Sequence, residues 1–407
     1  MLRLDPGLVE QMKLAAPDLG IISGSELTYI RKLSYFRSMV SRGNTSEIFP
    51  MRPNIGPNSP GMLETAVLAR DLEATDGRDK IFALWNLAQD NGKLDFKMDY
   101  TQSIPSSFKD FVTAWSAQHK SLVIIAVSEC NERSKAFYEE APSWCPDWTA
   151  PSAVSCLVRR DWLPVRQMLL MDSLDGELYK ADGGMKNEEL VEPLFEFYDN
   201  TLLCTGVIID EVQDFLVMQG DGLETHRDIF YAFVRYVTDE YSSKYSGLYD
   251  DARQAAWAMC HGDVPSAWLP REQSQFASDR YPLEDYVCEQ ERSRFLLKYA
   301  GGYDRPEAWD TVKMSLRGRQ FALSRKGYMC LVPQELSRRT GVLHMAIIAT
   351  CSVPVLLEAV DEASYRFVGS CFVQGWMEGE VFAACMDVGS PREYWEVNHD
   401  SSKLLIV

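Results

Sequence analysis

The feature that most constrains the fold is a series of short apolar segments between residues 319 and 376, each followed by a few polar or turn-forming residues. Valine, isoleucine, phenylalanine and tyrosine are frequent in them, as is typical of β-strands. Because the links are too short to contain a crossover helix, successive strands are expected to pair antiparallel, as a meander or a partial barrel. The clearest turns are at Lys326-Gly327, Ser352-Val353 and Asp361-Glu362.

The longest apolar tract, Leu343 to Val360, approaches the length of a membrane span. It contains the polar residues His344 and Glu358 and a Ser-Val-Pro sequence that ends at Pro354. Two buried strands around a turn therefore explain this tract better than a membrane helix. A further strand is predicted earlier in the chain, in LLCTGVIIDEV at 202–212.

Residues before 150 have helical periodicity instead. In ATDGRDKIFALWNLA, Asp76 is a suitable N-cap, and apolar residues follow at helical spacing from Ile81 to Ala88. The segment DYTQSIPSSFKDFVTAW predicts a second amphipathic helix, whereas SLVIIAV at 121–127 fits either a strand or a helix. Aromatic residues at helical intervals, as in HRDIFYAFVRYV, indicate a helical insertion at about 226–300.

The chain of 407 residues is therefore predicted to be α+β, with a helical N-terminal part packed on an antiparallel meander or partial barrel that contains a helical insertion. Three regions are expected. Residues 1–60 form an N-terminal segment that ends in the proline- and glycine-rich linker FPMRPNIGPNSPG, residues 61–150 form the helical region, and residues 151–407 form the β-rich region.

Charge and cysteine usage restrict the partners. The 41 basic and 59 acidic residues give a formal charge of −18, and no window is basic enough to follow a phosphate backbone, so nucleic acid is not an expected partner. The N-terminus lacks the apolar segment of a signal peptide, which favours a cytoplasmic protein. None of the ten cysteines forms a CxxC pair, so they are expected to be reduced and mostly buried, and no metal or cofactor is predicted.

Two motifs carry a resemblance to a known family. ATDGRDKIFALWNLA is similar to a helix that follows a D-P-R-D-K turn, with Gly77 in place of the proline, and APSWCPDWTAP reproduces a P-S-W-x-P-D-W signature. Together with the strands at 318–333 and 351–380, they make the chain resemble the fungal heterokaryon-incompatibility family, or HET-domain proteins, over roughly residues 61–385.

The resemblance covers only the part of such proteins that follows the HET domain. Family members begin with an A-L-S-Y-x-W-G segment in a Toll-like domain implicated in cell death. Here Leu33, Ser34 and Tyr35 are followed by Phe36 and Arg37. We therefore expect that the HET domain is missing and that cell killing or NAD hydrolysis by that domain does not transfer to this chain.

The candidate site residues are those at which a polar or aromatic side chain falls in an apolar context. His344 and Gln374 are the candidate catalytic residues, because each lies in a predicted strand where the family pattern has another residue. Candidate substrate contacts are Glu358 and three tryptophans, Trp144, Trp148 and Trp376. The structural alternatives are a hydrogen-bonded core histidine, tryptophans that fill the core, and an Asx-type turn at Asp147.

No nucleophile elbow, zinc spacing or phosphate-binding loop is present in the sequence. The chemistry that remains needs mainly enclosure, so one hypothesis is a cofactor-independent cyclase of fungal specialised metabolism that catalyses a cycloaddition or isomerisation of a terpene-like or polyketide-like intermediate. The alternative is a non-enzymatic HET-like recognition or regulatory protein. The cyclase requires a closed apolar cavity, whereas the recognition protein requires a filled interior and an apolar surface patch. The sequence does not predict the oligomeric state.

Overall fold

The computed structural model describes residues 61–88, 90–129, 132–158, 179–184, 193–216, 226–245, 247–249, 252–260, 315–385 and 403–407. The chain forms two units, residues 1–59 and 60–407, and all described residues belong to the second. The predicted linker before Gly61 and the insertion beyond residue 260 lie outside the described residues.

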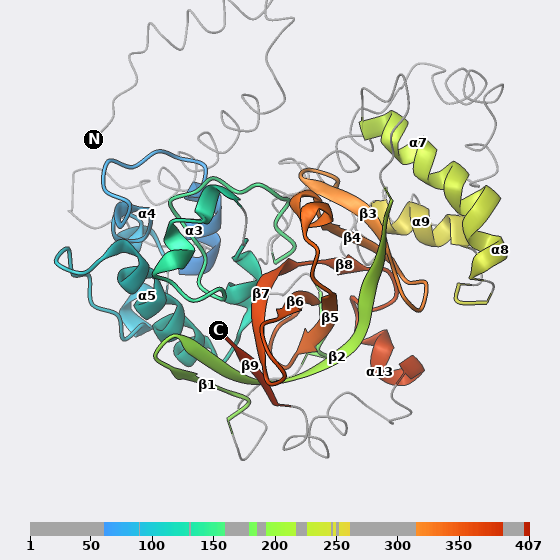
Figure 1. Cartoon of the computed structure of the whole chain (residues 1–407). Helices are drawn as coiled ribbons and strands as arrows, with labels where there is room; N and C mark the ends of the chain where they lie inside the picture. The colour runs from blue at the N-terminus through green and yellow to red at the C-terminus, as the bar shows by residue number, and fades with distance from the viewer. Residues whose placement is uncertain are drawn as a thin grey trace, which may run out of the picture. The chain divides into compact units, whose positions relative to one another are not determined.

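The predicted α+β class is confirmed, and the sheet is largely antiparallel and partly closed (Figure 1). Its central element is the sixteen-residue strand β2, Thr201–Leu216, which pairs in turn with β9, β5 and β3. Irregular registers between Ile208 and Asp210 and between Val212 and Asp214 accompany these changes of partner, as expected of bulges that bend a strand. The curvature of β2 in Figure 1 follows from this arrangement.

A closed circuit of five strands forms one end of the sheet. It consists of β2, β5 (Leu343–Ile348), β6 (Val355–Ala359), β7 (Ser364–Ser370) and β9 (Lys403–Ile406). Each neighbouring pair is antiparallel except β7 with β9, which is parallel. The predicted pair of strands around the Ser-Val-Pro turn is therefore confirmed as β5 and β6. The short strand β1, Phe195–Tyr198, forms a hairpin with the start of β2.

The other end of the sheet extends through β3 (Arg319–Ser324), β4 (Met329–Pro333) and β8 (Phe372–Val373). The helical insertion covers this end with α7 (His226–Tyr236), a π-helical turn (Val237–Tyr241), α8 (Ser242–Lys244) and α9 (Ala252–Cys260). The Phe233 ring stacks on Phe321 at 3.8 Å, and the Tyr241 hydroxyl donates to the Gly327 carbonyl at 2.8 Å. A short 3₁₀ helix, Gln334–Arg338, follows β4, and α13, Glu380–Cys385, follows β8.

The helical part consists mainly of α3 (Met62–Ala69) and α5 (Ile104–His119). The prediction for α5 is confirmed: Ser103 caps its first turn, and Phe108, Phe111, Val112 and Trp115 are buried. The helix predicted after Asp76 is wrong in extent. α4 spans only Asp79–Phe82, and a 3₁₀ turn at Trp85–Leu87 replaces the rest.

The undecided segment at 121–127 is a buried 3₁₀ helix, Val123–Val127, and three further 3₁₀ turns occur at Asn91–Lys93, Glu132–Ser134 and Phe137–Glu139. Among the described helices, none is long and apolar enough to cross a bilayer.

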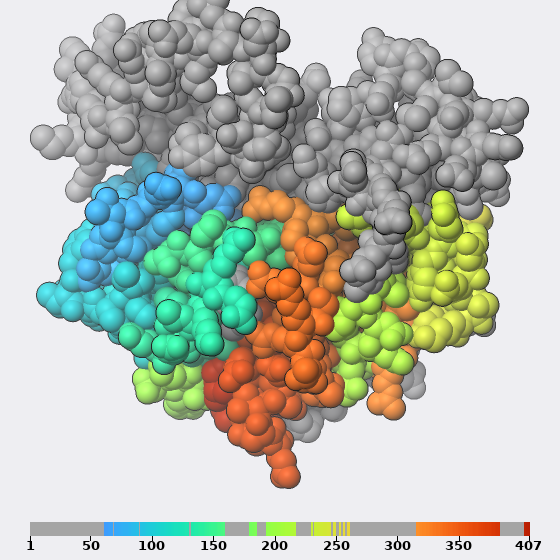
Figure 2. Space-filling model, turned by 45° about the horizontal axis from the view of Figure 1, so that its top comes forward, coloured from blue at the N-terminus to red at the C-terminus, as the bar shows by residue number. Residues whose placement is uncertain are grey.

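The helical part and the sheet are directly bonded within the second unit. The Leu122 amide donates to the Thr350 carbonyl at 2.9 Å, and the Trp144 ring packs on Phe197. On the face shown in Figure 2, the blue-to-green helical part meets the orange and red strands along a continuous surface. These contacts join the helical region before residue 150 to the β-rich region after it.

Candidate functional site

His344 lies on β5 near the end of the five-stranded circuit, opposite Glu211 of β2 and Leu357 of β6. Its Nδ1 is 3.6 Å from the Glu211 carboxylate, which is longer than a hydrogen bond, and its ring packs edge-on against Tyr365. Its side chain is 19% exposed. His344 is thus a sheet residue beside a surface carboxylate.

Glu358 points to the other face of the same strands. His344 is paired with Leu357, so Glu358, the next residue, lies on the opposite side of the pleat. Its carboxylate accepts a hydrogen bond from Arg339 Nη1 at 2.7 Å, and Arg366 Nη1 is 3.8 Å away. These two candidate residues, on the paired strands β5 and β6, therefore face opposite sides of the sheet and cannot act on one ligand.

Gln374 and Trp376 lie in the turn after β8, where the sequence predicted strand and the structure has none. The Gln374 backbone is bonded on both sides, with its N–H donating to Met329 and its carbonyl accepting from the Tyr249 hydroxyl at 3.0 Å. The Trp376 ring is fully buried against Tyr328. Gln374 and His344 share no hydrogen bond or ring contact in the described part of the chain.

Trp144 and Trp148 belong to the P-S-W-C-P-D-W segment, and both are fully buried. Trp144 Nε1 donates to the Asn200 carbonyl at 3.2 Å, while Trp148 packs edge-on against Phe111. The predicted Asx turn is confirmed, because one Asp147 carboxylate oxygen accepts from both the amide and the hydroxyl of Thr149. The tryptophans thus pack as core residues, each against a neighbouring aromatic side chain.

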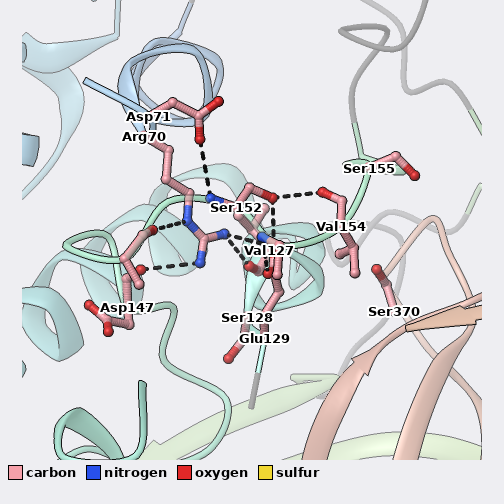
Figure 3. Close-up of polar contacts among 12 residues, drawn as sticks. Arg70, Asp71, Val127, Ser128, Glu129, Asp147, Ser152, Val154, Ser155 and Ser370 are labelled. Atoms are coloured by element: carbon pink, nitrogen blue, oxygen red, sulfur yellow. Dashed lines mark hydrogen bonds and ion pairs between the residues drawn. The ribbon is translucent and has the colours of Figure 1, made fainter. Parts of the chain in front are cut away.

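Behind this segment is a buried ion pair that sequence reasoning missed (Figure 3). Arg70, at the end of α3, is 2% exposed, and its Nη1 lies 3.3 Å from the Glu129 carboxylate. The same guanidinium donates to three backbone carbonyls, those of Val127 at 2.8 Å, Ala150 at 3.0 Å and Asp147 at 3.1 Å. Its centre lies 5.8 Å from the Trp148 ring centroid. One side chain therefore connects three separate parts of the helical region: the end of α3, residues 127–129 and residues 147–150.

Glu129 completes this junction by fixing the chain after the motif. It accepts hydrogen bonds from the Ser152 hydroxyl at 2.7 Å and from the Ala153 amide at 2.8 Å. A few residues on, Ser155 accepts from a second buried arginine, Arg319 of β3, which also donates to the Ser370 carbonyl at 2.8 Å. Among the described residues, no carboxylate pairs with Arg319, and burial lowers its pKa. Its donors are used by protein oxygens, which indicates a structural role.

The D-G-R-D-K motif has a similar use. Asp76 accepts from the amide, Nε and Nη2 of Arg78 at 2.7–2.9 Å, and the hydrogen bonds from Arg78 lower the pKa of Asp76. Arg78 Nη1 in turn donates to the carbonyls of Tyr100 and Gln102. Lys80 Nζ caps the end of α3 by donating to the carbonyls of Arg70 and Leu72. The motif thus holds the loop before α5 in place.

A concave surface site lies beside that loop. The groove has a volume of about 510 Å³ and lies between residues 95–102 and the outer face of α5. It is open to solvent, and three of its ten lining residues are aspartates. Its lining residues are Asp95, Phe96, Lys97, Asp99, Gln102, Asp110, Thr113, Ala114, Ala117 and Gln118, so it contains none of the six residues proposed from the sequence.

In the described part of the chain, no group of three or more His, Cys, Asp or Glu side chains is placed to hold a metal ion. Seven of the cysteines in the described part of the chain are free thiols, and all of these but Cys156 are buried, as predicted. Comparison of the chain with protein-family models, curated proteins and solved structures finds no match.

Proposed function

We propose that this chain is a non-enzymatic recognition or regulatory protein, similar to HET-family proteins, that acts in discrimination between self and non-self. The observation that carries the proposal is the open groove beside α5, which lies next to two exposed apolar side chains, Met98 and Tyr100. Exposed apolar groups beside a concave polar surface are typical of a protein-binding site. The family resemblance is supported by the D-G-R-D-K and P-S-W-C-P-D-W motifs.

The distribution of the candidate site residues supports the same conclusion. His344 and Glu358 lie on opposite faces of the sheet, and Gln374 lies at the β8 end of it. Trp144, Trp148 and Trp376 pack against other aromatic side chains. A cyclase would need several of these groups around one enclosed substrate, whereas a recognition protein needs only a stable body and an accessible surface.

The cofactor-independent cyclase acting on a small apolar substrate is the second candidate, because one observation favours it. Trp376 Nε1 is buried and makes no hydrogen bond in the described part of the chain. An unpaired buried donor is costly, and a substrate carbonyl would satisfy it. Since Trp376 is near Tyr328 and Tyr249, any such substrate would bind between β4 and the helical insertion.

Gene deletion with two readouts separates these functions. In a fungus that carries the gene, the recognition protein predicts altered heterokaryon formation between strains and an unchanged metabolite profile, with both restored by a reintroduced wild-type copy. If deletion leaves strain compatibility intact and an unsaturated intermediate accumulates, recognition is refuted. Conversion of that intermediate by the purified protein would then establish the cyclase. Fractionation of the same strains tests the cytoplasmic location that accompanies the proposal.

A further inference from the structure

One wall of the groove beside α5 is a strand-like segment, Leu94–Met98, that belongs to no sheet. Leu94 is buried, and Phe96 packs inward against the rings of Phe82, Trp85 and Phe111. Asp95 and Lys97, between and after them, are exposed. From Leu94 to Lys97 this alternation is that of a β-strand with one face on a core, whereas the next residue, Met98, is exposed.

Among the described residues, none provides a hydrogen-bond partner for the polar backbone groups of this segment. Within the part of the chain that the structure describes, no N–H or carbonyl from Leu94 to Met98 takes part in a hydrogen bond with another residue. In a strand-like segment these groups point sideways, at right angles to the alternating side chains, and therefore along the protein surface. A row of unpaired groups is a template to which another strand can add.

The segment is held firmly at both ends. Asn91 donates from its side chain to the Trp85 carbonyl at 2.7 Å before it. After it, Arg78 binds the carbonyls of Tyr100 and Gln102, and the Tyr100 hydroxyl donates to Asp79 at 2.6 Å. Because these contacts fix the segment before any partner arrives, little ordering cost remains for strand addition.

The opposite wall is the outer face of α5, and the charges around the groove favour a cation. Thr113, Ala114 and Ala117 leave room between the helix and the segment, and Asp110 lies at one side. Three aspartates against the one lysine, Lys97, give a formal charge of −2. Hydrogen bonds from the hydroxyl and amide of Thr101 lower the pKa of Asp99, so that carboxylate is ionised at neutral pH.

We propose that the groove binds an extended segment of a partner protein that carries lysine or arginine at alternate positions, added as a β-strand along Leu94–Met98. The five residues offer about 16 Å of backbone, enough for one short strand. Basic side chains of the added strand reach Asp95 and Asp110, and its apolar side chains contact Met98, which is 43% exposed. This inference rests on the proposed recognition function and names its surface and its partner chemistry.

A second copy of this chain fits the groove poorly. The protein carries a formal charge of −18, so an acidic groove facing another copy would add to a general repulsion. Small cations satisfy the charge but leave the row of backbone groups unused. A basic extended peptide is the ligand that uses both.

Binding of synthetic peptides to the full-length chain tests the proposal by fluorescence anisotropy. The probe is a labelled heptapeptide of alternating lysine and valine. One comparison peptide carries N-methyl groups on alternate amides and another has glutamate in place of lysine. We expect the parent peptide to bind about ten-fold more tightly than either, and more weakly as salt rises from about 50 to about 300 mM.

Matched variants distinguish the effect of the groove carboxylates on peptide binding from the effect of the protein's net charge. Asp95→Asn with Asp110→Asn is expected to weaken binding of the lysine peptide about ten-fold. Glu196→Gln with Glu362→Gln removes the same charge from exposed positions elsewhere and should leave binding within about two-fold. Equal losses in the two double variants, or equal binding of the N-methylated peptide, would overturn strand addition at this groove. So would a dimer, seen in sedimentation, that the Asp95→Asn and Asp110→Asn variant dissociates.

The two proposals fail separately. A negative peptide result leaves the compatibility phenotype of the deletion strain as it was, and refutes only the addition of a basic strand at the groove. An unaltered compatibility phenotype refutes the recognition function, whatever the peptides show.

Discussion

Replacement of Arg70 by methionine tests whether the buried junction in Figure 3 holds the helical part together. Methionine keeps most of the apolar stem but removes the guanidinium, which is 2% exposed and donates to the Glu129 carboxylate and to three carbonyls. Breaking a buried ion pair from one side costs about 3–5 kcal/mol. Glu129 keeps its hydrogen bonds from Ser152 and Ala153, so we expect a loss of about 4 kcal/mol in the free energy of unfolding.

Equilibrium urea unfolding followed by tryptophan fluorescence measures this loss, because Trp148 lies beside the guanidinium. The control is Arg325→Met, which removes an arginine whose side chain is 74% exposed and lies 3.9 Å from Glu211. Exposed pairs of this kind contribute at most about 1 kcal/mol. A shift for Arg70→Met within about 1 kcal/mol of the control would refute the reasoning.

Glu129→Gln keeps the experiment decisive if Arg70→Met does not fold. The amide retains the shape of the carboxylate and one acceptor oxygen, so the charge of the pair and the hydrogen bonds to the other oxygen are lost. A variant with both Arg70→Met and Glu129→Leu is expected to be more stable than Arg70→Met alone, because it contains no buried carboxylate that has lost its arginine partner. Additive losses would show that the two side chains do not act as a pair.

Three further predictions concern other contacts. Gly318→Ala should destabilise the protein by about 2 kcal/mol or more, because φ is +66° and a Cβ would lie 1.9 Å from the Ala153 carbonyl oxygen. In the control Gly92→Ala the new Cβ meets open space, so the melting temperature should change little. Ser143→Ala should cost about 1–3 kcal/mol in urea unfolding, because the hydroxyl accepts from the Phe367 amide at 2.9 Å and donates to the Val407 carbonyl. Burial raises the pKa of Cys204 from 9.0 to about 12. The stability that this neutral thiol contributes is therefore complete below pH 9 and is lost as the pH rises towards 12. Between these pH values the free energy of unfolding should fall less steeply for Cys204→Ala than for the wild type, and parallel pH profiles of the two proteins would contradict this.

The sequence predicted the sheet well because alternation and short turns are local signals. The strands from β3 to β7 and residues 202–212 of β2 were identified, as was the helix α5. The closed circuit could not be predicted, because it depends on bulges that redirect β2 and on the distant strand β9. The helix after Asp76 was overestimated because Asp76 is occupied by Arg78 and does not cap a longer helix.

The candidate site was harder to predict, because its residues were selected only as polar or aromatic side chains in apolar segments. Buried tryptophans and a histidine in a strand have the same sequence signature whether they fill a core or line a pocket. The residues that carry the tertiary junction, Arg70 and Glu129, lie in segments with no distinctive pattern and meet across 59 positions of the chain. The groove beside α5 was missed for a related reason, because unpaired backbone groups have no signature in the side chains.

The side chains of the D-G-R-D-K and P-S-W-C-P-D-W motifs make contacts that hold the fold together. Arg78 and Lys80 direct their donors to backbone carbonyls, and the P-S-W-C-P-D-W segment supplies a carbonyl to Arg70 and two core tryptophans. Groups used in this way are not available to a substrate, so a function must use other groups of the molecule. The segment Leu94–Met98 lies between the two motifs, and in the described part of the chain its backbone groups have no hydrogen-bond partner. A recognition function would therefore use this surface, which the motifs hold in place without forming it.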